Sequence, residues 1–213
     1  MPENISDKTA EILIDIGSVN FNIQNPFKLT SGKLSPVYCD CRRIISFPEE
    51  REKLINFAVS KIKEQKFYKQ ISNISGGETA GIPFSALIAA KLKLPMTYIR
   101  KQTKKFGKKE QIEGILKKSE KVVLVEDLLT DGGSKRDFIN ALEKKGAYVK
   151  AVFVIFNYGI FEDYFYHGEN KIKLIYLTSW KSILKIAKRK KKISDSNSKI
   201  VHEFLTKMGI KNL

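Results

Sequence analysis

Cysteine, histidine and tryptophan are scarce in this sequence, which restricts the chemistry that it can carry. The 213 residues include two cysteines, two histidines and one tryptophan. Cys39 and Cys41 have too few other ligands beside them for a zinc site, and their i, i+2 spacing on an expected strand disfavours a mutual disulfide. We expect both to be reduced structural thiols. His167 and His202 form no obvious pair with an acid or a nucleophile, and we interpret them as surface residues.

Long apolar segments are also absent. Hydrophobic residues make up 42% of the chain, yet no stretch approaches the length of a membrane span, so the sequence predicts a soluble globular protein without a membrane partner. The first residues contain no basic segment followed by an apolar core, so we expect no signal peptide and a cytoplasmic location. A chain of this length fits one domain with a sizeable core.

Acidic residues are few relative to basic ones. There are 23 Asp and Glu against 39 Lys and Arg, a formal net charge of +16. Three explanations are open: nucleic-acid binding, an anionic small-molecule substrate, or a lysine-rich composition. Lysine far outnumbers arginine and is scattered over every segment, whereas base readout and bidentate phosphate recognition favour arginine. We therefore interpret most lysines as a solvated surface and do not expect a nucleic-acid partner, although the positive field should speed the arrival of a polyanionic substrate.

Helical and strand patterns alternate along the chain. The first helix is expected at about 7–16, capped by Ser6 or Asp7, and the last at about 195–207. Between them we expect helices at about 46–62, 82–93 and 134–145, and strands at about 71–74, 95–100, 122–125 and 148–156. Such alternation predicts an α/β fold, with a mostly parallel twisted sheet and helices on both faces.

Residues 122–135 carry the most informative motif: an apolar strand, two adjacent carboxylates, and a glycine-rich turn that opens a helix. Buried parallel strands end at the ligand crevice of an α/β sheet, so Glu126 and Asp127 are expected at that edge. The two glycines that follow permit a tight turn, and the amides of 130–134 lie where a helix N-terminus can bind an anion. Because carboxylates accept hydrogen bonds from vicinal hydroxyls, this loop can hold a ribose 5-phosphate at both ends.

Two further segments suit a polyanionic ligand. The glycine-rich loop 76–83 also follows a strand and opens a helix, so its backbone amides are suited to a pyrophosphate group. The segment 98–114 is rich in cations and has little apolar periodicity, which is typical of a solvated loop. Taken alone, this segment is best explained as a solvated loop.

Together these motifs resemble those of the type I phosphoribosyltransferases. Residues 126–127, two apolar residues and the Thr-Asp-Gly-Gly-Ser stretch 130–134 are similar to their phosphoribosyl pyrophosphate (PRPP) motif. The Arg-Lys pair 100–101, the basic stretch and the Glu-Gly return at 113–114 resemble the catalytic loop of the orotate phosphoribosyltransferases. Residues 27–40 resemble the N-terminal hood segment of the same family.

The resemblance implies a type I phosphoribosyltransferase-like fold with a small N-terminal hood. It implies a single domain over 1–213, with a hood at about 1–45, a catalytic core at about 46–178 and C-terminal helices at about 179–213. It also implies transfer of the 5-phosphoribosyl group from PRPP to orotate, giving orotidine 5′-phosphate and pyrophosphate in pyrimidine biosynthesis. Mg²⁺ would be bound mainly through PRPP, with no metal ligands of the protein's own. The loop 100–114 would close over the neighbouring subunit's active site in a homodimer.

The resemblance also assigns roles to individual residues. Lys104 and Asp127 would be catalytic: Lys104 would stabilise the leaving pyrophosphate, and Asp127 would hold the ribose hydroxyls with Glu126. The expected PRPP-binding residues are Arg100, Lys101, Lys104, Glu126, Asp127, Thr130, Asp131, Gly132, Gly133 and Ser134, with Thr79 and Ala80 in the glycine loop. The orotate carboxylate needs a cation or an amide nest and the ring a stacking partner, so the expected orotate-binding residues are Lys28, Ser31, Tyr38 and Thr130.

Four positions depart from the better-known bacterial pattern of this family. Thr30 and Ala80 replace lysines, Phe106 replaces a loop histidine, and Asn157 follows the strand where an orotate-contacting arginine is expected. Two alternatives stay open: a phosphoribosyltransferase for another base, and a non-catalytic PRPP-sensing regulator that binds nucleic acid. The basic loop favours an enzyme, because a sensor has no need of leaving-group cations.

Overall fold

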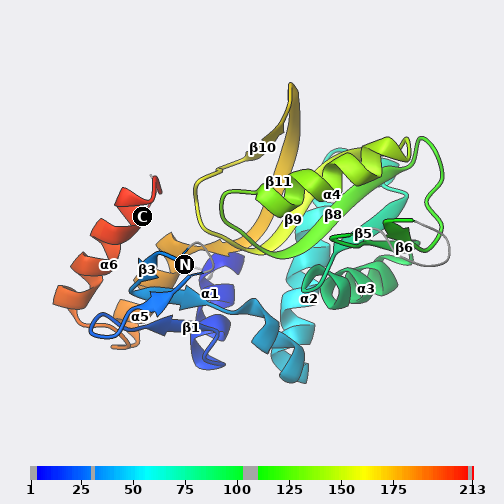
Figure 1. Ribbon diagram of the computed structural model, residues 1–213. Coiled ribbons are helices and arrows are strands. Elements are labelled where there is room, and N and C mark those ends of the chain that lie inside the picture. Colours follow the sequence, from blue (N-terminus) through cyan, green and yellow to red (C-terminus); the bar gives the residue numbers. More distant parts are fainter. Residues whose placement is uncertain (1–3, 30–31, 103–109, 211–212) are drawn as a thin grey trace.

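The computed structural model describes residues 4–29, 32–102, 110–210 and 213, and its centre is a seven-stranded sheet (Figure 1). The strand order is β10-β11-β9-β8-β5-β6-β7. The strands are β5 (Asn73–Gly77), β6 (Met96–Ile99), β7 (Ile112–Glu113), β8 (Lys121–Leu129), β9 (Tyr148–Asn157), β10 (Tyr164–His167) and β11 (Asn170–Ser179). Neighbours among the five inner strands are parallel, and the edge strands β10 and β7 are antiparallel to theirs. The predicted mostly parallel sheet is confirmed.

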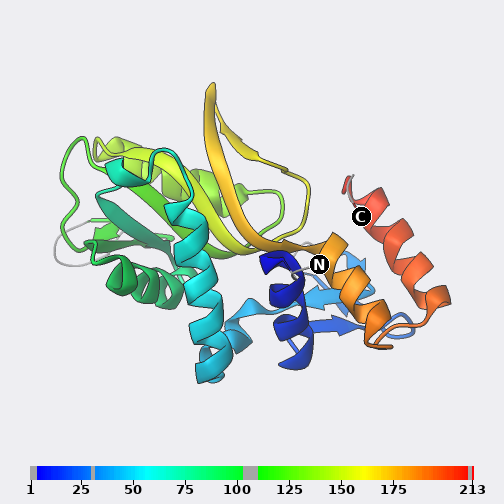
Figure 2. The ribbon, with the colours of Figure 1, turned by 180° about the vertical axis from the view of Figure 1, so that it is seen from behind.

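Helices cover both faces of the sheet because the central strands are apolar on both sides. Along β8, Val123 and Val125 belong to one hydrophobic cluster, and Val122 and Leu124 belong to the other. The first cluster includes side chains of α1 (Ile5–Asp15), α2 (Pro48–Lys63) and α3 (Gly81–Leu92), and the second includes those of α4 (Gly133–Lys144). Helix α4 crosses in front of the sheet in Figure 1, and α2 lies in front of it when the molecule is seen from behind in Figure 2.

A lobe beside the sheet combines the two ends of the chain. Its N-terminal part contains α1, the antiparallel pairs β1 (Val19–Phe21) with β4 (Val37–Cys39) and β2 (Phe27–Lys28) with β3 (Leu34–Ser35), and the 3-10 helix η1 (Cys41–Ser46). The C-terminal helices α5 (Trp180–Arg189) and α6 (Asp195–Lys207) lie next to these elements in Figure 1, and α5 packs against α1. A short 3-10 helix, η2 (Tyr68–Gln70), precedes β5. The division of the domain at about residues 45 and 178 stays a prediction.

Helix α1 begins earlier than the sequence suggests. Its first residue is Ile5, because Asn4 is the N-cap: the Asn4 side chain accepts a hydrogen bond from the Asp7 amide at 2.8 Å. The predicted cap at Ser6 or Asp7 is therefore wrong. The Asp7 carboxylate instead pairs with Lys185 on α5, so it joins the two ends of the chain.

Strand β8 and the sheet edge also differ from the prediction. β8 continues to Leu129, beyond the expected end at Val125, because β9 pairs with it as far as Asn157. The two carboxylates therefore lie within the strand, near its carboxyl end. The hairpin of β10 and β11, which adds an antiparallel edge to the sheet, was not expected from the sequence pattern.

The scarce residues are mostly structural. Cys39 and Cys41 are both buried free thiols, as predicted. Their Sγ atoms lie 3.7 Å apart, within reach of a thiol–thiol hydrogen bond. His202 is exposed, as expected. The His167 side chain, in contrast, is only 13% exposed, and its Nε2 lies 3.0 Å from Asn140 Oδ1 on α4. In the part of the chain that the structure describes, no helix is both long and apolar enough to cross a membrane.

Candidate active site

The candidate site lies at the carboxyl ends of the parallel strands, and Glu126 on β8 is at its centre. Glu126 is 5% exposed, and its Oε2 lies 2.8 Å from Nζ of Lys135 in the first turn of α4. Burial raises the pKa of Glu126 to about 7, although the charge of Lys135 opposes this shift. The other oxygen, Oε1, is buried and has no hydrogen-bond partner among the described residues. This oxygen lies against the glycine loop, since a Cβ on Gly77 or Gly81 would meet it.

Asp127 follows on the same strand, where the hood meets the sheet. Burial raises the pKa of Asp127, while the charge of Lys135 and a hydrogen bond from the Leu128 amide, at 2.8 Å, oppose the shift. The 3-10 helix η1 packs against β8, and this brings Cys41 and Arg42 within electrostatic range of Asp127. The site is thus bordered by the N-terminal hood on one side and by α4 on the other.

The loop between β8 and α4 is the segment for which the sequence predicts an amide nest. Gly132 has φ of +80° and is the N-cap of α4, so the N-cap residue itself has no side chain to bond the first amides of the helix. The Gly133 amide donates to Asp131 Oδ1 at 3.3 Å. A Cβ on Gly132 would clash with the Phe165 ring, and Arg136 lies over that ring and donates to the Asp131 carbonyl oxygen at 2.9 Å. The loop also carries Thr130 and Ser134, so the five predicted residues lie together at a helix N-terminus suited to phosphate.

The glycine loop 76–81 lies directly against the end of β8. A Cβ on Gly77 would clash with the Glu126 carboxylate, and one on Gly81 would clash with the Val125 carbonyl oxygen. Only glycine permits so close an approach of two backbones. The predicted pyrophosphate loop and the carboxylates are therefore immediate neighbours.

The same loop is tied to the beginning of the basic segment. The Glu78 amide donates to the Ile99 carbonyl oxygen at 2.8 Å, and Glu78 Oε2 accepts from the Lys101 amide at 2.7 Å. Thr79 is exposed and Ala80 half-buried at the turn, where the peptide bond before Thr79 is cis. The loops after β5 and β6 thus lie side by side at the sheet edge that carries the β8 carboxylates.

Arg100, the first cation of the basic segment, is held by the residues that return from it. Its amide donates to the Gln111 carbonyl oxygen at 2.8 Å, and its carbonyl oxygen accepts from Gln111 Nε2 at 2.9 Å. Its Nη1 lies 3.9 Å from Glu113 Oε1. Lys104 lies outside the described residues, so its role stays a prediction from the sequence.

The hood contributes an aromatic pair and a second arginine. The rings of Phe27 and Tyr38 have centroids 5.6 Å apart, and Arg42 Nη2 donates to the Tyr38 hydroxyl at 3.3 Å. Of the other predicted orotate ligands, Lys28 is exposed on β2 and Ser31 lies outside the described residues.

The sequence reasoning missed Lys135 and Arg42. The signal for Lys135 is its spacing, because it lies at i relative to apolar residues at i+3, i+4 and i+7 on the buried face of α4: Phe138, Ile139 and Leu142. A lysine on such a face needs a buried partner, and Glu126 provides it. Arg42 carries no comparable signal, because only the packing of η1 on β8 brings it to the site.

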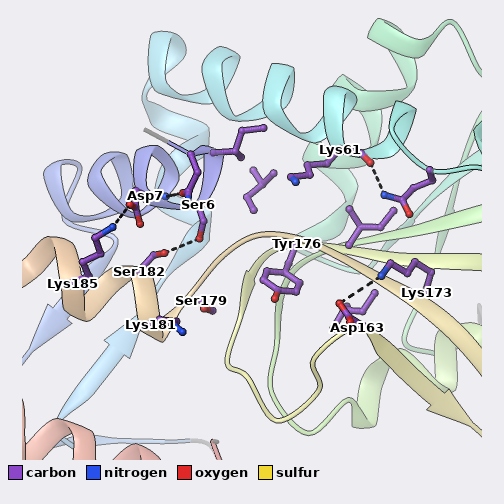
Figure 3. Close-up of a pocket in the computed structure, with 16 residues that line it drawn as sticks. Ser6, Asp7, Lys61, Asp163, Lys173, Tyr176, Ser179, Lys181, Ser182 and Lys185 are labelled. Atoms are coloured by element: carbon purple, nitrogen blue, oxygen red, sulfur yellow. Dashed lines mark hydrogen bonds and ion pairs between the residues drawn. The ribbon is translucent and has the colours of Figure 1, made fainter. Parts of the chain in front are cut away.

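A separate cavity of about 550 Å³ lies between α1, β11 and α5 (Figure 3). Asp7 and Lys185 form an ion pair beside it, and the hydroxyls of Ser6 and Ser182 lie 2.9 Å apart. None of the predicted site residues lines this cavity. Its contacts instead join the N-terminal helix to α5.

The match of this chain to a known protein family agrees with this geometry. The family described as "Phosphoribosyl transferase domain" matches residues 48–161, which are more than half of the chain and include β5, β8 and both glycine-rich loops. The protein is therefore a phosphoribosyltransferase, with the type I fold that its sequence motifs predict.

Individual relatives show to which family of phosphoribosyltransferases the chain belongs. An orotate phosphoribosyltransferase of Ruegeria sp. (strain TM1040) is 44% identical over 204 residues, covering 95% of this chain and 90% of the relative. The chain belongs to the orotate phosphoribosyltransferase family. The crystal structure of orotate phosphoribosyltransferase from Aeropyrum pernix has a TM-score of 0.69 at 26% identity, covering 84% of this chain and 98% of that one. The structure of Leishmania donovani UMP synthase shares the fold, with a TM-score of 0.76 at 23% identity, and this match spans 94% of our chain and 42% of that one.

Proposed function

We propose that this enzyme transfers the 5-phosphoribosyl group from PRPP to orotate, a step of pyrimidine nucleotide synthesis in the cytoplasm. A bond forms between a ring nitrogen of orotate and the anomeric carbon of the ribose, and the bond from that carbon to the pyrophosphate oxygen breaks. The observation that carries the proposal is the placement of Glu126 and Asp127 between the amide nest 130–134 and the glycine loop 76–81.

The ribose and its 5-phosphate fit the two parts of the β8 to α4 connection. Asp127 and Glu126 would accept hydrogen bonds from the ribose hydroxyls. The 5-phosphate would bind the amides and hydroxyls of 130–134, because the N-cap residue Gly132 has no side chain to occupy this helix N-terminus. This arrangement fixes the anomeric carbon relative to the glycine loop.

The pyrophosphate would lie over the glycine loop, at Thr79 and Ala80. Arg100, Lys101 and Lys104 would place positive charge near its oxygens, which gain negative charge as the bond breaks. The described residues contain no group of three or more His, Cys, Asp or Glu side chains that could hold a metal ion. Mg²⁺ would therefore arrive on the PRPP phosphates, which suits its preference for phosphate and water oxygens. When bound, it would share the charge of the leaving group.

Orotate would lie on the hood side, with Tyr38 against the ring and Lys28, Ser31 and Thr130 among its ligands.

We further propose a homodimer in which each loop 100–114 serves the partner's site. Mixing Lys104→Ala with Asp127→Asn protein tests this, because a mixed dimer would then contain one intact site. Recovery of about a quarter of wild-type activity is expected if subunits exchange freely, and no recovery would contradict the shared site.

The reaction is tested by the loss of orotate absorbance with purified protein, PRPP and Mg²⁺, run beside uracil, hypoxanthine and adenine. Turnover of orotate alone is expected. Asp127→Asn and Lys104→Ala should each lower kcat by about 100-fold or more, as removal of single transition-state contacts does. The matched control is Lys63→Ala, an exposed lysine at the end of α2, which should leave turnover unchanged.

The outcome also separates the alternatives. Turnover of another base would identify a phosphoribosyltransferase of different specificity. If no base reacts and the protein binds random DNA or RNA with a strong salt dependence, the regulator hypothesis would replace the enzyme.

A further inference from the structure

Arg42 is held in a fixed orientation by its neighbour Asp40. Its Nε lies 2.6 Å from Asp40 Oδ1, and its Nη2 lies 3.0 Å from Oδ2. The Arg42 amide also donates to Oδ1, at 3.1 Å, since Asp40 is the N-cap of η1. A bidentate pair of this kind fixes the plane of the guanidinium group as well as its position.

This pairing leaves one edge of the guanidinium open. An arginine has five N–H donors, and Asp40 takes two of them. Nη2 also donates to the Tyr38 hydroxyl at 3.3 Å, and Nη1 has no hydrogen-bond partner among the described residues. The Arg42 side chain is 58% exposed, so Nη1 is accessible to a ligand.

Arg42 belongs to the part of the hood that meets the predicted ribose contact. Tyr38 forms the aromatic pair of the hood with Phe27, and η1 packs against the strand that carries Asp127. The hydrogen bond to Asp40 raises the pKa of Arg42, and the charge of Asp127 acts in the same direction. Tyr38 and Arg42 thus lie on the side of the site where the hood meets the strand of Asp127.

Several other charged or polar groups of this region are engaged within the protein. Lys135 binds Glu126, and Arg136 lies over the Phe165 ring. The Asn157 side chain is also used within the protein: its Nδ2 donates to the Phe161 carbonyl oxygen at 2.7 Å, and its Oδ1 accepts from the Gly159 amide at 3.0 Å. Beside the exposed Lys28 of β2, Arg42 is therefore a cation of the hood with an open donor for an anionic group on the base.

We propose that Arg42 binds the carboxylate of orotate through its Nη1 and Nη2 edge, where the carboxylate replaces the 3.3 Å contact of Nη2 with the Tyr38 hydroxyl, and that Asp40 positions it. This inference rests on the proposed function and adds the residue that determines base specificity. Planar guanidinium and carboxylate groups match in a bidentate contact, and uracil, which lacks the carboxylate, would gain nothing from it. The site would thus select orotate by charge at the position that distinguishes it from uracil.

The experiment compares the binding of orotidine 5′-phosphate and uridine 5′-phosphate by calorimetry, because these ligands differ only in the carboxylate. Arg42→Gln should reduce the preference for orotidine 5′-phosphate by about tenfold or more, with uridine 5′-phosphate affinity and KM for PRPP unchanged. The preference of Arg42→Lys for orotidine 5′-phosphate should fall between those of wild type and Arg42→Gln, because lysine keeps the charge without the bidentate edge. The matched control is Arg43→Gln: this adjacent exposed arginine donates to the Ile16 carbonyl oxygen instead, and its loss should leave the preference unchanged.

Asp40→Asn tests the positioning role separately. It should weaken orotidine 5′-phosphate binding less than Arg42→Gln, and the double variant should show no further loss, since both changes act on the same contact. Circular dichroism of every variant checks that the fold is intact.

Each outcome decides the inference. An unchanged preference in folded Arg42→Gln, or an equal loss in Arg43→Gln, would overturn it even if the enzyme turns over orotate. A wild-type protein that shows no preference for orotidine 5′-phosphate would overturn it as well. If wild-type protein has the preference and Arg42→Gln loses it, but orotate is not turned over, the assignment of Arg42 stands and the proposed reaction fails.

Discussion

Glu126 Oε2 and Lys135 Nζ lie 2.8 Å apart, and both side chains are less than one-tenth exposed. The pair joins the carboxyl end of β8 to the first turn of α4, and so it fixes the two elements between which the ribose phosphate is proposed to bind. Such a pair adds little net stability relative to an apolar pair, because two charges must be desolvated to form it. Removing one partner, however, leaves a buried charge without compensation.

Lys135→Met is therefore expected to destabilise the protein by about 3–5 kcal/mol, since Glu126 would remain buried without a cation. The free energy of unfolding, from urea titration at pH 7.5, measures this. Lys144→Met is the matched control on the same helix, where the lysine is exposed, and it should change stability by less than about 0.5 kcal/mol. The double variant Lys135→Met with Glu126→Gln should recover much of the loss. Equal effects of the two single substitutions would contradict the buried pair.

The raised pKa of Glu126 predicts a pH dependence of stability. Burial raises this pKa from 4.5 to about 7, so the folded protein holds the proton over a pH range where the unfolded chain has lost it. Stability should then decrease as pH rises from 4.5 to 7, and the contribution of Glu126 to this decrease is roughly 3 kcal/mol. The contribution of Glu126 is isolated by measuring the free energy of unfolding of the wild type and of Glu126→Gln at each pH and taking the difference. A difference that is constant across this range, or that matches the difference obtained with exposed Glu49→Gln, would contradict the shift.

The close approach of the glycine loop to β8 predicts a strong effect of one methyl group. A Cβ on Gly77 would meet both the Glu126 carboxylate and the Phe138 ring, so Gly77→Ala should cost about 1–3 kcal/mol and displace the carboxylate. Thermal unfolding and the affinity for PRPP report the two consequences. Gly133→Ala is the control for stability, because a Cβ there meets only Asp131 Oδ1, at 3.9 Å, and alanine is favourable at a helix start. If Gly77→Ala is as stable as Gly133→Ala, the loop does not lie against β8 as described.

The core of the fold and the grouping of the carboxylates with the two glycine-rich loops could be predicted because their signals are local. The apolar run Val122–Val125, the two acids and the glycine-rich turn follow one another in the chain, so strand, site and helix start are specified within one segment. The contacts that were missed join distant segments. Neither the docking of α5 on α1 nor the packing of η1 beside Asp127 leaves a periodic pattern in the sequence.

The N-cap of α1 shows, for a single residue, what could not be predicted from the sequence. Asn4, Ser6 and Asp7 are all good capping residues, so propensity alone does not choose between them. The choice depends on Lys185, which is 178 residues away and binds the Asp7 carboxylate. A tertiary contact thus decides a local feature.

The Asp7–Lys185 pair gives a last prediction, about the junction of the two ends of the chain. The hydrogen bond from Lys185 lowers the pKa of Asp7 below 3.8, although burial opposes it, so the carboxylate is stabilised in the folded state. Asp7→Ala should therefore cost about 1–3 kcal/mol at pH 7, and this cost should shrink as pH falls below 3.8, where protonation of Asp7 removes the same contact in the wild type. Urea unfolding at pH 7 and pH 3 tests both. Glu11→Ala, which removes a more exposed acid from the same helix, should cost less than about 1 kcal/mol. An equal loss from both substitutions would show that general charge balance, rather than this buried contact, holds α1 against α5.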